Sequence, residues 1–62
     1  MDNKGIIGRK VKWIVFGLLG IETVLGKIVD YTEMDGYYRV EGYTLFGMRH
    51  KEIKNITELE FE

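Results

Sequence analysis

The central half of the chain constrains the fold most, because strand-forming segments alternate there with turn-forming ones. Residues 22–31 and 37–43 are rich in β-branched and aromatic side chains, which favour strands. The pair Asp35-Gly36 lies between them, and this dipeptide is among the strongest short-range hairpin signals. We therefore predict two antiparallel strands joined by a turn over residues 32–36.

The second of these strands alternates cleanly between two kinds of side chain. Neighbouring residues of a strand point to opposite faces, so every second residue shares a face. We expect Tyr38 and Val40 to lie in the core. The opposite face, toward solvent or a partner, then carries Tyr37, Arg39, Glu41 and Tyr43. In the preceding strand, Gly26 predicts a bulge or a sharp bend.

Residues 9–16 form a further candidate strand, which starts with alternating charges and becomes wholly apolar. We expect it to begin half-exposed and to become buried on both faces. Two glycines then flank Leu18 and Leu19, which predicts a loop carrying both leucines. In one interpretation these leucines fold back to complete the core, and in the other they project from the surface.

The C-terminal third predicts a strand over residues 45–49, a short helical turn over residues 51–56 and a last strand. Glutamates alternate with Leu59 and Phe61 in that last segment. The competing interpretation is a single helix over residues 49–59, because Ile53, Ile56 and Leu59 are three residues apart.

A chain of 62 residues is long enough for one domain. We expect a flexible N-terminal arm over residues 1–8 and a folded domain over residues 9–62, near the lower limit at which an apolar core suffices. Association between copies is a natural supplement for so small a core. The chain contains no Cys, which excludes disulfides and thiolate metal sites within it.

The longest apolar run, residues 13–21, is about half the roughly 20 residues that a membrane-spanning helix needs. No small-residue cleavage site follows it, so a secretory signal is not indicated. We expect a cytoplasmic protein that does not associate with membranes. The formal net charge of -1 also argues against a protein that binds by neutralising many phosphates.

The order of the predicted elements resembles that of the SH3-like small β-barrels. The resemblance covers residues 9–61 and rests on Gly26-Lys27-Ile28-Val29, Tyr38-Arg39-Val40 and the helical turn before the last strand. It includes Tudor-like, KOW-like and small phage- or plasmid-encoded barrels. It implies an all-β, five-stranded barrel that acts as a binding module of phage, plasmid or prophage origin, such as a modulator of a host protein.

The chain is also similar in size and strand order to the plasmid-encoded trimethoprim-resistant dihydrofolate reductases. Their catalytic Val-Gln-Ile-Tyr run has no counterpart, because residues 46–50 read Phe-Gly-Met-Arg-His here. The resemblance therefore does not imply reductase activity.

Catalytic groups are scarce in this sequence. There is no Cys, no Ser and a single histidine, His50, which lies between Arg49 and Lys51. One histidine and scattered carboxylates offer no metal-ligand spacing. We therefore expect a non-enzymatic protein without a metal or cofactor. An enzyme whose pocket forms by oligomerisation is the remaining catalytic alternative.

Our main prediction is a module that binds a protein partner, with self-association as an open possibility. Leu18 and Leu19 would form an apolar contact, and charged side chains would complement the partner at the rim. The predicted protein-binding residues are Leu18, Leu19, Tyr37, Tyr43, Arg49 and Lys51.

The alternative prediction is single-stranded DNA or RNA binding by one face of the barrel. Aromatic side chains, Trp13 among them, would stack on bases while cations contact phosphates. The residues of this alternative are Lys10, Lys12, Tyr31, Arg39, Arg49 and Lys54.

Overall fold

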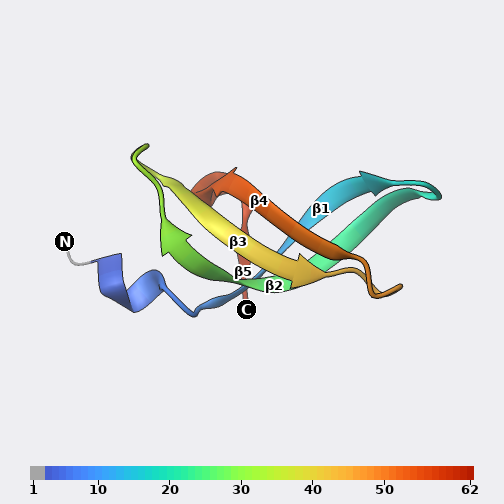
Figure 1. The fold of residues 1–62 in the computed structure, drawn as a ribbon, viewed down its shortest axis with the longest axis horizontal. Coiled ribbons are helices and arrows are strands. Elements are labelled where there is room, and N and C mark those ends of the chain that lie inside the picture. The colour runs from blue at the N-terminus through green and yellow to red at the C-terminus, as the bar shows by residue number, and fades with distance from the viewer. Residues whose placement is uncertain (1–2) are drawn as a thin grey trace.

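The structure is a computed structural model that describes residues 3–62. Its elements are two short 3-10 helices and five strands (Figure 1). They are η1 (Asn3–Ile6), β1 (Lys10–Gly17), β2 (Gly20–Tyr31), β3 (Tyr37–Tyr43), β4 (Arg49–Asn55), η2 (Ile56–Glu58) and β5 (Glu60–Phe61). The all-β prediction is confirmed, and so are the bounds of β3 and the turn that precedes it.

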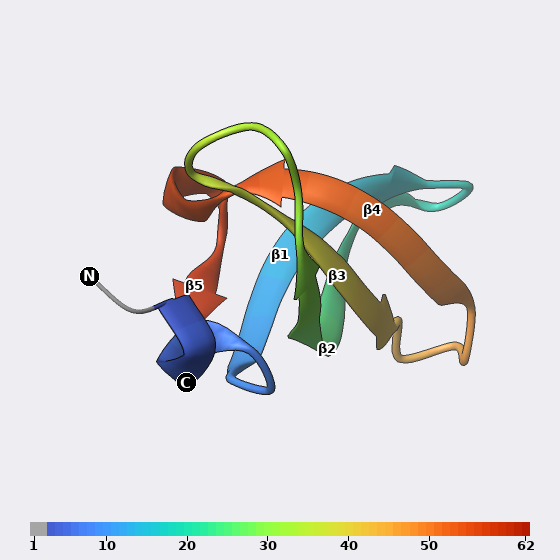
Figure 2. The same cartoon turned by 60° about the vertical axis from the view of Figure 1, so that its left-hand side comes forward.

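All five strands form a single antiparallel sheet in the order β4-β3-β2-β1-β5. The sheet is strongly curved, and the connection through η2 carries the chain from one edge strand back to the other (Figure 2). The two edge strands, β4 and β5, are not paired with each other over residues 3–62. The sheet is therefore not a closed barrel.

The core lies on the concave face and is small. Its buried apolar side chains come from every long strand except β4, because the inward positions of β4 are half-buried polar residues. The core residues are Val11, Trp13, Val24, Ile28, Tyr38, Val40 and Leu59. Tyr38 and Val40 lie there as predicted, and Trp13 is a core residue rather than an accessible stacking platform.

The N-terminal segment contacts this core. Ile6 and Ile7 are half-buried against it, and the N–H of Gly8 donates to the carbonyl of Ile28 at 2.7 Å. The Arg9 carbonyl accepts in turn from the N–H of Ile28 at 3.1 Å. Residues 1 and 2 of the predicted arm lie outside the described residues.

Three predictions about the C-terminal half are corrected. Residues 45–48 form a loop rather than a strand, and β4 occupies the residues expected to form a helical turn, which follows later as η2. The alternative helix over residues 49–59 is also wrong. Alternation of half-buried and exposed side chains along β4, with β-bridges to β3, dominates over the three-residue spacing of the isoleucines.

The bulge lies in a different place from the one predicted. Strand register shifts between Ile28 and Asp30, two residues beyond Gly26. Gly26 instead pairs with Gly42 on β3, where the two backbones approach so closely that neither position has room for a Cβ atom. These two glycines allow the close backbone contact between β2 and β3.

Candidate functional site

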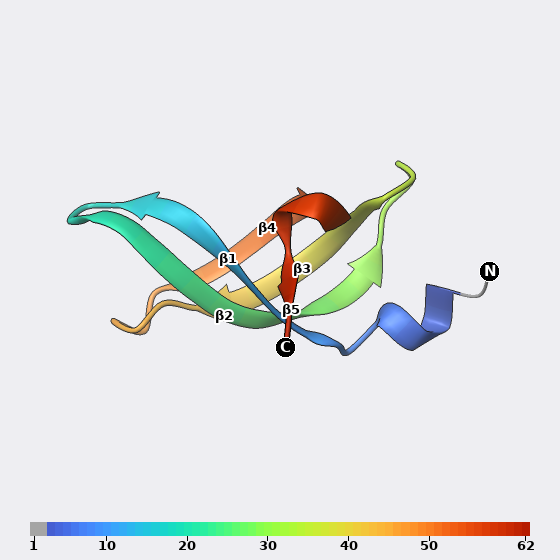
Figure 3. The same ribbon diagram turned by 180° about the vertical axis from the view of Figure 1, so that it is seen from behind.

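Exposed apolar side chains gather at one end of the molecule, which we call the apolar end. It is formed by the β1–β2 hairpin tip and the loop between β3 and β4, and both lie at the same end of the long axis (Figures 1 and 3). Its residues are Phe16, Leu18, Leu19, Ile21, Leu45, Phe46 and Met48. A hollow of about 220 Å³ joins the two parts and is lined by side chains of both, including Ile21 and Phe46.

The hairpin tip exposes its apolar side chains because no other segment of residues 3–62 packs over it. Leu18 is fully exposed, Leu19 is 82% exposed and Phe16 is 86% exposed. The leucines therefore project from the surface and do not complete the core. The prediction that residues 9–16 become buried on both faces is wrong, because Ile14 and Phe16 point to the open outer face.

The loop over residues 44–48 is held in place by its own hydrogen bonds. The N–H of Gly47 donates to the Thr44 carbonyl, and the N–H of Thr44 donates to the Met48 carbonyl at 3.0 Å. Gly47 has a φ of 83°, which favours glycine at this turn. These hydrogen bonds lie within the loop. The side chains of Leu45, which is 89% exposed, and Phe46 extend outward.

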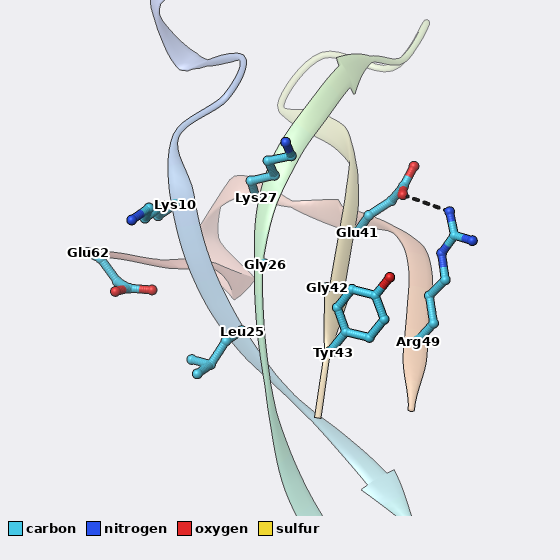
Figure 4. Close-up of a pocket in the computed structure, with 9 residues that line it drawn as sticks. All are labelled: Lys10, Leu25, Gly26, Lys27, Glu41, Gly42, Tyr43, Arg49 and Glu62. Carbon is cyan, nitrogen blue, oxygen red and sulfur yellow. Dashed lines mark hydrogen bonds and ion pairs between the residues drawn. The ribbon is translucent and has the colours of Figure 1, made fainter. Parts of the chain in front are cut away.

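A second surface lies on the outer face of the sheet (Figure 4). A shallow groove of about 520 Å³ crosses β1, β2, β3 and β4. Its lining residues are Lys10, Leu25, Gly26, Lys27, Glu41, Gly42, Tyr43, Arg49 and Glu62. The Arg49 guanidinium contacts the Glu41 carboxylate at 3.2 Å, so one of the cations is already paired with an acid.

The structure brings together some of the predicted protein-binding residues. Tyr43 is paired with Arg49 across β3 and β4, and Lys51 is one row further along the same face. Tyr37 lies at the opposite end of β3 from Tyr43 and is half-buried. The two leucines are at the hairpin tip, so the predicted set occupies more than one region.

The predicted nucleic-acid residues are dispersed further. Lys10, Lys12 and Arg49 lie on the outer face, and the Lys12 ammonium is 3.9 Å from the Glu60 carboxylate. Lys54 projects from the other face of the sheet, where it is paired with Glu52. Tyr31 and Arg39 lie toward the β2–β3 turn, away from Arg49. No continuous basic and aromatic track joins the six predicted residues.

Sequence reasoning missed the residues that make the apolar end large. Phe16 and Ile21 are paired directly across the hairpin that Leu18 and Leu19 close. The hairpin register would have revealed that pair, since a two-residue turn places its flanking residues opposite each other. Leu45 and Phe46 were missed because they were assigned to a strand.

A polar cluster surrounds Glu52 on the concave side of β4. The Trp13 indole Nε1 donates to Glu52 Oε2 at 3.1 Å, His50 Nδ1 lies 3.4 Å from the same oxygen, and Lys54 Nζ lies 3.4 Å from Oε1. Partial burial acts to raise the pKa of Glu52, but hydrogen bonds from Trp13 and Lys54, with the charges of Lys54 and His50, outweigh it. The pKa of Glu52 is therefore held below its ordinary value.

We expect Glu52→Gln to lower the free energy of unfolding by about 1 kcal/mol at pH 7, because Gln keeps an acceptor for Trp13 but loses the charge. A carboxylate with a lowered folded-state pKa stabilises the protein above its ordinary pKa, and this stabilisation is lost as the pH falls. The difference between wild type and variant should therefore shrink below about pH 5. Urea denaturation from pH 7 to pH 3 measures it, and parallel pH profiles would contradict the assignment.

Neither the metal-ligating side chains nor the comparisons with known proteins point to a further site. Within residues 3–62, no three histidine or carboxylate side chains gather in a way that could hold a metal ion, and no helix is long and apolar enough to span a membrane. The comparisons with known proteins match this chain to no family model, no curated protein and no solved structure.

Proposed function

We propose that this chain is a non-catalytic, SH3-like interaction module that binds a protein through the apolar end. The SH3-like assignment is supported by five antiparallel strands with a short helical turn before the last one, the element order on which the resemblance rests. The binding assignment rests on one observation. Seven large apolar side chains from two separate segments are exposed together, as many as the apolar side chains buried in the core within residues 3–62.

A patch of seven large apolar side chains, each more than half exposed, is unusual on a protein that functions as a monomer. Monomeric proteins rarely expose more than a few hundred Å² of contiguous apolar surface, and larger patches mark sites of interaction. Burial of such side chains supplies most of the affinity of a protein interface, and aromatic anchors contribute strongly. Charged residues at the border, Glu22 among them, would then supply specificity more than affinity.

Protein binding is favoured over nucleic-acid binding by the placement of the cations. A phosphate track needs several unpaired cations on one face. Here Arg49, Lys12 and Lys54 each lie within 4 Å of a carboxylate. The apolar end, in contrast, has nothing over it among the described residues.

Site-specific photo-crosslinking tests this function. A photoreactive phenylalanine analogue at Phe46 should give abundant covalent protein adducts, and the same analogue at Tyr31, an exposed aromatic at the other end, should give few. In a Leu18→Asp and Leu19→Asp background the yield at Phe46 should fall at least about tenfold, because each anchor contributes about 1.4 kcal/mol or more.

Circular dichroism is the control for this experiment. The double substitution should leave the spectrum and the melting temperature almost unchanged, because both leucines are exposed. Equal adduct yields at Phe46 and Tyr31, or a yield at Phe46 that the aspartates do not reduce, would contradict the proposed function.

A further inference from the structure

The outer half of β1 has a free edge. β5 pairs only with Val11 and Lys12, so over residues 3–62 no strand pairs with β1 on the side away from β2 from Ile14 to Phe16. This is the stretch in which β1 extends toward the hairpin tip (Figures 1 and 3). A hollow of about 520 Å³ runs along this edge, between these residues and the inward side chains of β4, and leaves space beside the strand.

The backbone groups at this edge point outward. The Lys10 carbonyl accepts from the N–H of Glu62 on the β5 side, whereas the Arg9 carbonyl accepts from Ile28 on the β2 side. Backbone groups of successive residues in an antiparallel strand point to alternate sides. Ile14 and Phe16 therefore share the direction of Lys10, and each presents one N–H donor and one carbonyl acceptor to the open edge.

This edge lacks the features that prevent strands from pairing. Natural edge strands carry charged side chains, prolines or bulges. From Trp13 to Ile21 the sequence contains no charge and no proline, and β1 pairs with β2 without a register shift. The free edge of β4 differs, because its outward backbone groups belong to a segment containing Arg49 and Lys51, and the N–H of Asn55 is taken by Glu58 at 3.0 Å.

The surface areas also indicate a missing partner. The chain exposes 4789 Å², whereas a compact monomer of 7.3 kDa exposes about 4,200 Å². A large apolar side chain carries on the order of 150–200 Å². Ile14 and the seven residues of the apolar end, each more than half exposed, thus offer roughly 1,000 Å². A specific interface needs about 800 Å² from each partner.

We propose that the partner of this surface is a second copy of the chain, paired through the free edge of β1. The two β1 strands run antiparallel about a two-fold axis at Val15, so that Ile14 of each copy lies opposite Phe16 of the other. Both residues have outward backbone groups, so each such pair exchanges two hydrogen bonds. This inference rests on the proposed function, because it identifies the protein bound at that site.

A second copy suits this edge for two reasons. The strand that forms this edge carries no charge from Trp13 to Ile21, and the side chains across the adjacent hollow carry charges of both signs, Glu52, Lys54 and Glu58 among them, so neither sign of charge selects an oppositely charged partner. The pairing is also self-complementary, as a two-fold interface requires, because Ile14 and Phe16 are equally spaced about Val15. Their side chains then lie side by side on the outer face, where cross-strand apolar pairs stabilise a sheet.

Proline substitution tests the backbone pairing. Phe16→Pro removes one outward donor, and Ile53→Pro is the matched control because Ile53 is an exposed apolar residue with an outward N–H on the other free edge. By light scattering after size-exclusion chromatography, we expect twice the 7.3 kDa chain mass for wild type and for Ile53→Pro. Phe16→Pro should give the single-chain mass with an unchanged strand content by circular dichroism.

A cysteine at the two-fold axis tests the register without altering the backbone. The chain has no Cys, so Val15→Cys introduces a single thiol. Two residues directly opposite in a non-hydrogen-bonded pair are about 4.5 Å apart at Cα, close enough for a disulfide. Mild oxidation should crosslink Val15→Cys into a dimer at least tenfold faster than Lys51→Cys, whose side chain is exposed on β4.

The outcomes separate this inference from the proposed function. A wild-type chain that stays at 7.3 kDa at millimolar concentration overturns the second-copy assignment. If Phe46 still crosslinks to other proteins in that case, the proposed function stands without it. A dimer that Phe16→Pro leaves intact, or equal oxidation rates for the two cysteines, overturns the β1 pairing. If the Phe16→Pro variant unfolds, the oxidation rates of Val15→Cys and Lys51→Cys decide whether the two β1 strands pair.

Discussion

Gly26→Ala is expected to unfold the protein or to leave it barely stable. A Cβ atom at position 26 would lie 2.6 Å from the Cα of Gly42 and closer still to the carbonyl oxygen of Glu41. Both are backbone atoms of β3, so relief requires β2 and β3 to separate at the middle of the sheet. Overpacking against side chains costs about 1–3 kcal/mol, and we expect at least 3 kcal/mol where the obstacle is backbone.

Such a loss is large for this chain. At roughly 0.05–0.15 kcal/mol per residue, the total stability of a domain of this length is only about 3–9 kcal/mol. Thermal and urea unfolding followed by circular dichroism measure the effect. Gly5→Ala is the control, because no atom lies within 4 Å of its Cβ position and its φ is not positive. A Gly26→Ala variant as stable as Gly5→Ala would show that the two strands tolerate separation.

Trp13→Ala is expected to cost about 3–5 kcal/mol, the range for removal of a buried large aromatic side chain. Trp13 is only 3% exposed, and it connects the core to the polar cluster on β4 through its indole N–H. Truncation therefore leaves a cavity and also removes a donor from Glu52. For a domain near the lower size limit, we expect a largely unfolded chain at 37 °C.

Trp13→Phe separates the two contributions. Phenylalanine keeps most of the apolar contact but has no donor for Glu52, so we expect a loss of about 1–2 kcal/mol. Urea denaturation at pH 7 compares the two variants by circular dichroism, since fluorescence of the single tryptophan is lost in both. Equal losses for Phe and Ala would mean that the hydrogen bond, rather than packing, dominates at this position.

The local sequence was a reliable guide where turn chemistry and alternation agreed. The strand over Tyr37–Tyr43 and the inward positions of Tyr38 and Val40 follow from period-two alternation behind an Asp-Gly turn. The exposed position of Leu18 and Leu19 could not be decided locally. A pair of leucines between glycines is compatible with a covered or an open hairpin tip, and only the arrangement of other segments around it distinguishes them.

Sequence reasoning failed where pairing partners decide the structure. Residues 45–48 are mostly apolar and include Phe46, which favours strands, but they are left in a loop because β3 pairs with β4 starting from the Tyr43–Arg49 bridge. Likewise, Gly26 stands out in the sequence, but the reason that a glycine is needed there is the close approach of Gly42, sixteen positions away in the chain. Strand propensity describes a half-buried pleated surface, and it carries no information about which strand provides that surface.

Sequence patterns alone establish an all-β chain with turns at several of its glycines and strands in which core residues alternate with polar ones. These properties depend on side-chain chemistry and on neighbours within a few residues. Long-range packing instead decides that the sheet stays open over residues 3–62, that β1 keeps a free edge at Ile14 and Phe16, and that two distant segments form one apolar end. Each of those depends on contacts between residues far apart in the chain, and local patterns do not encode them.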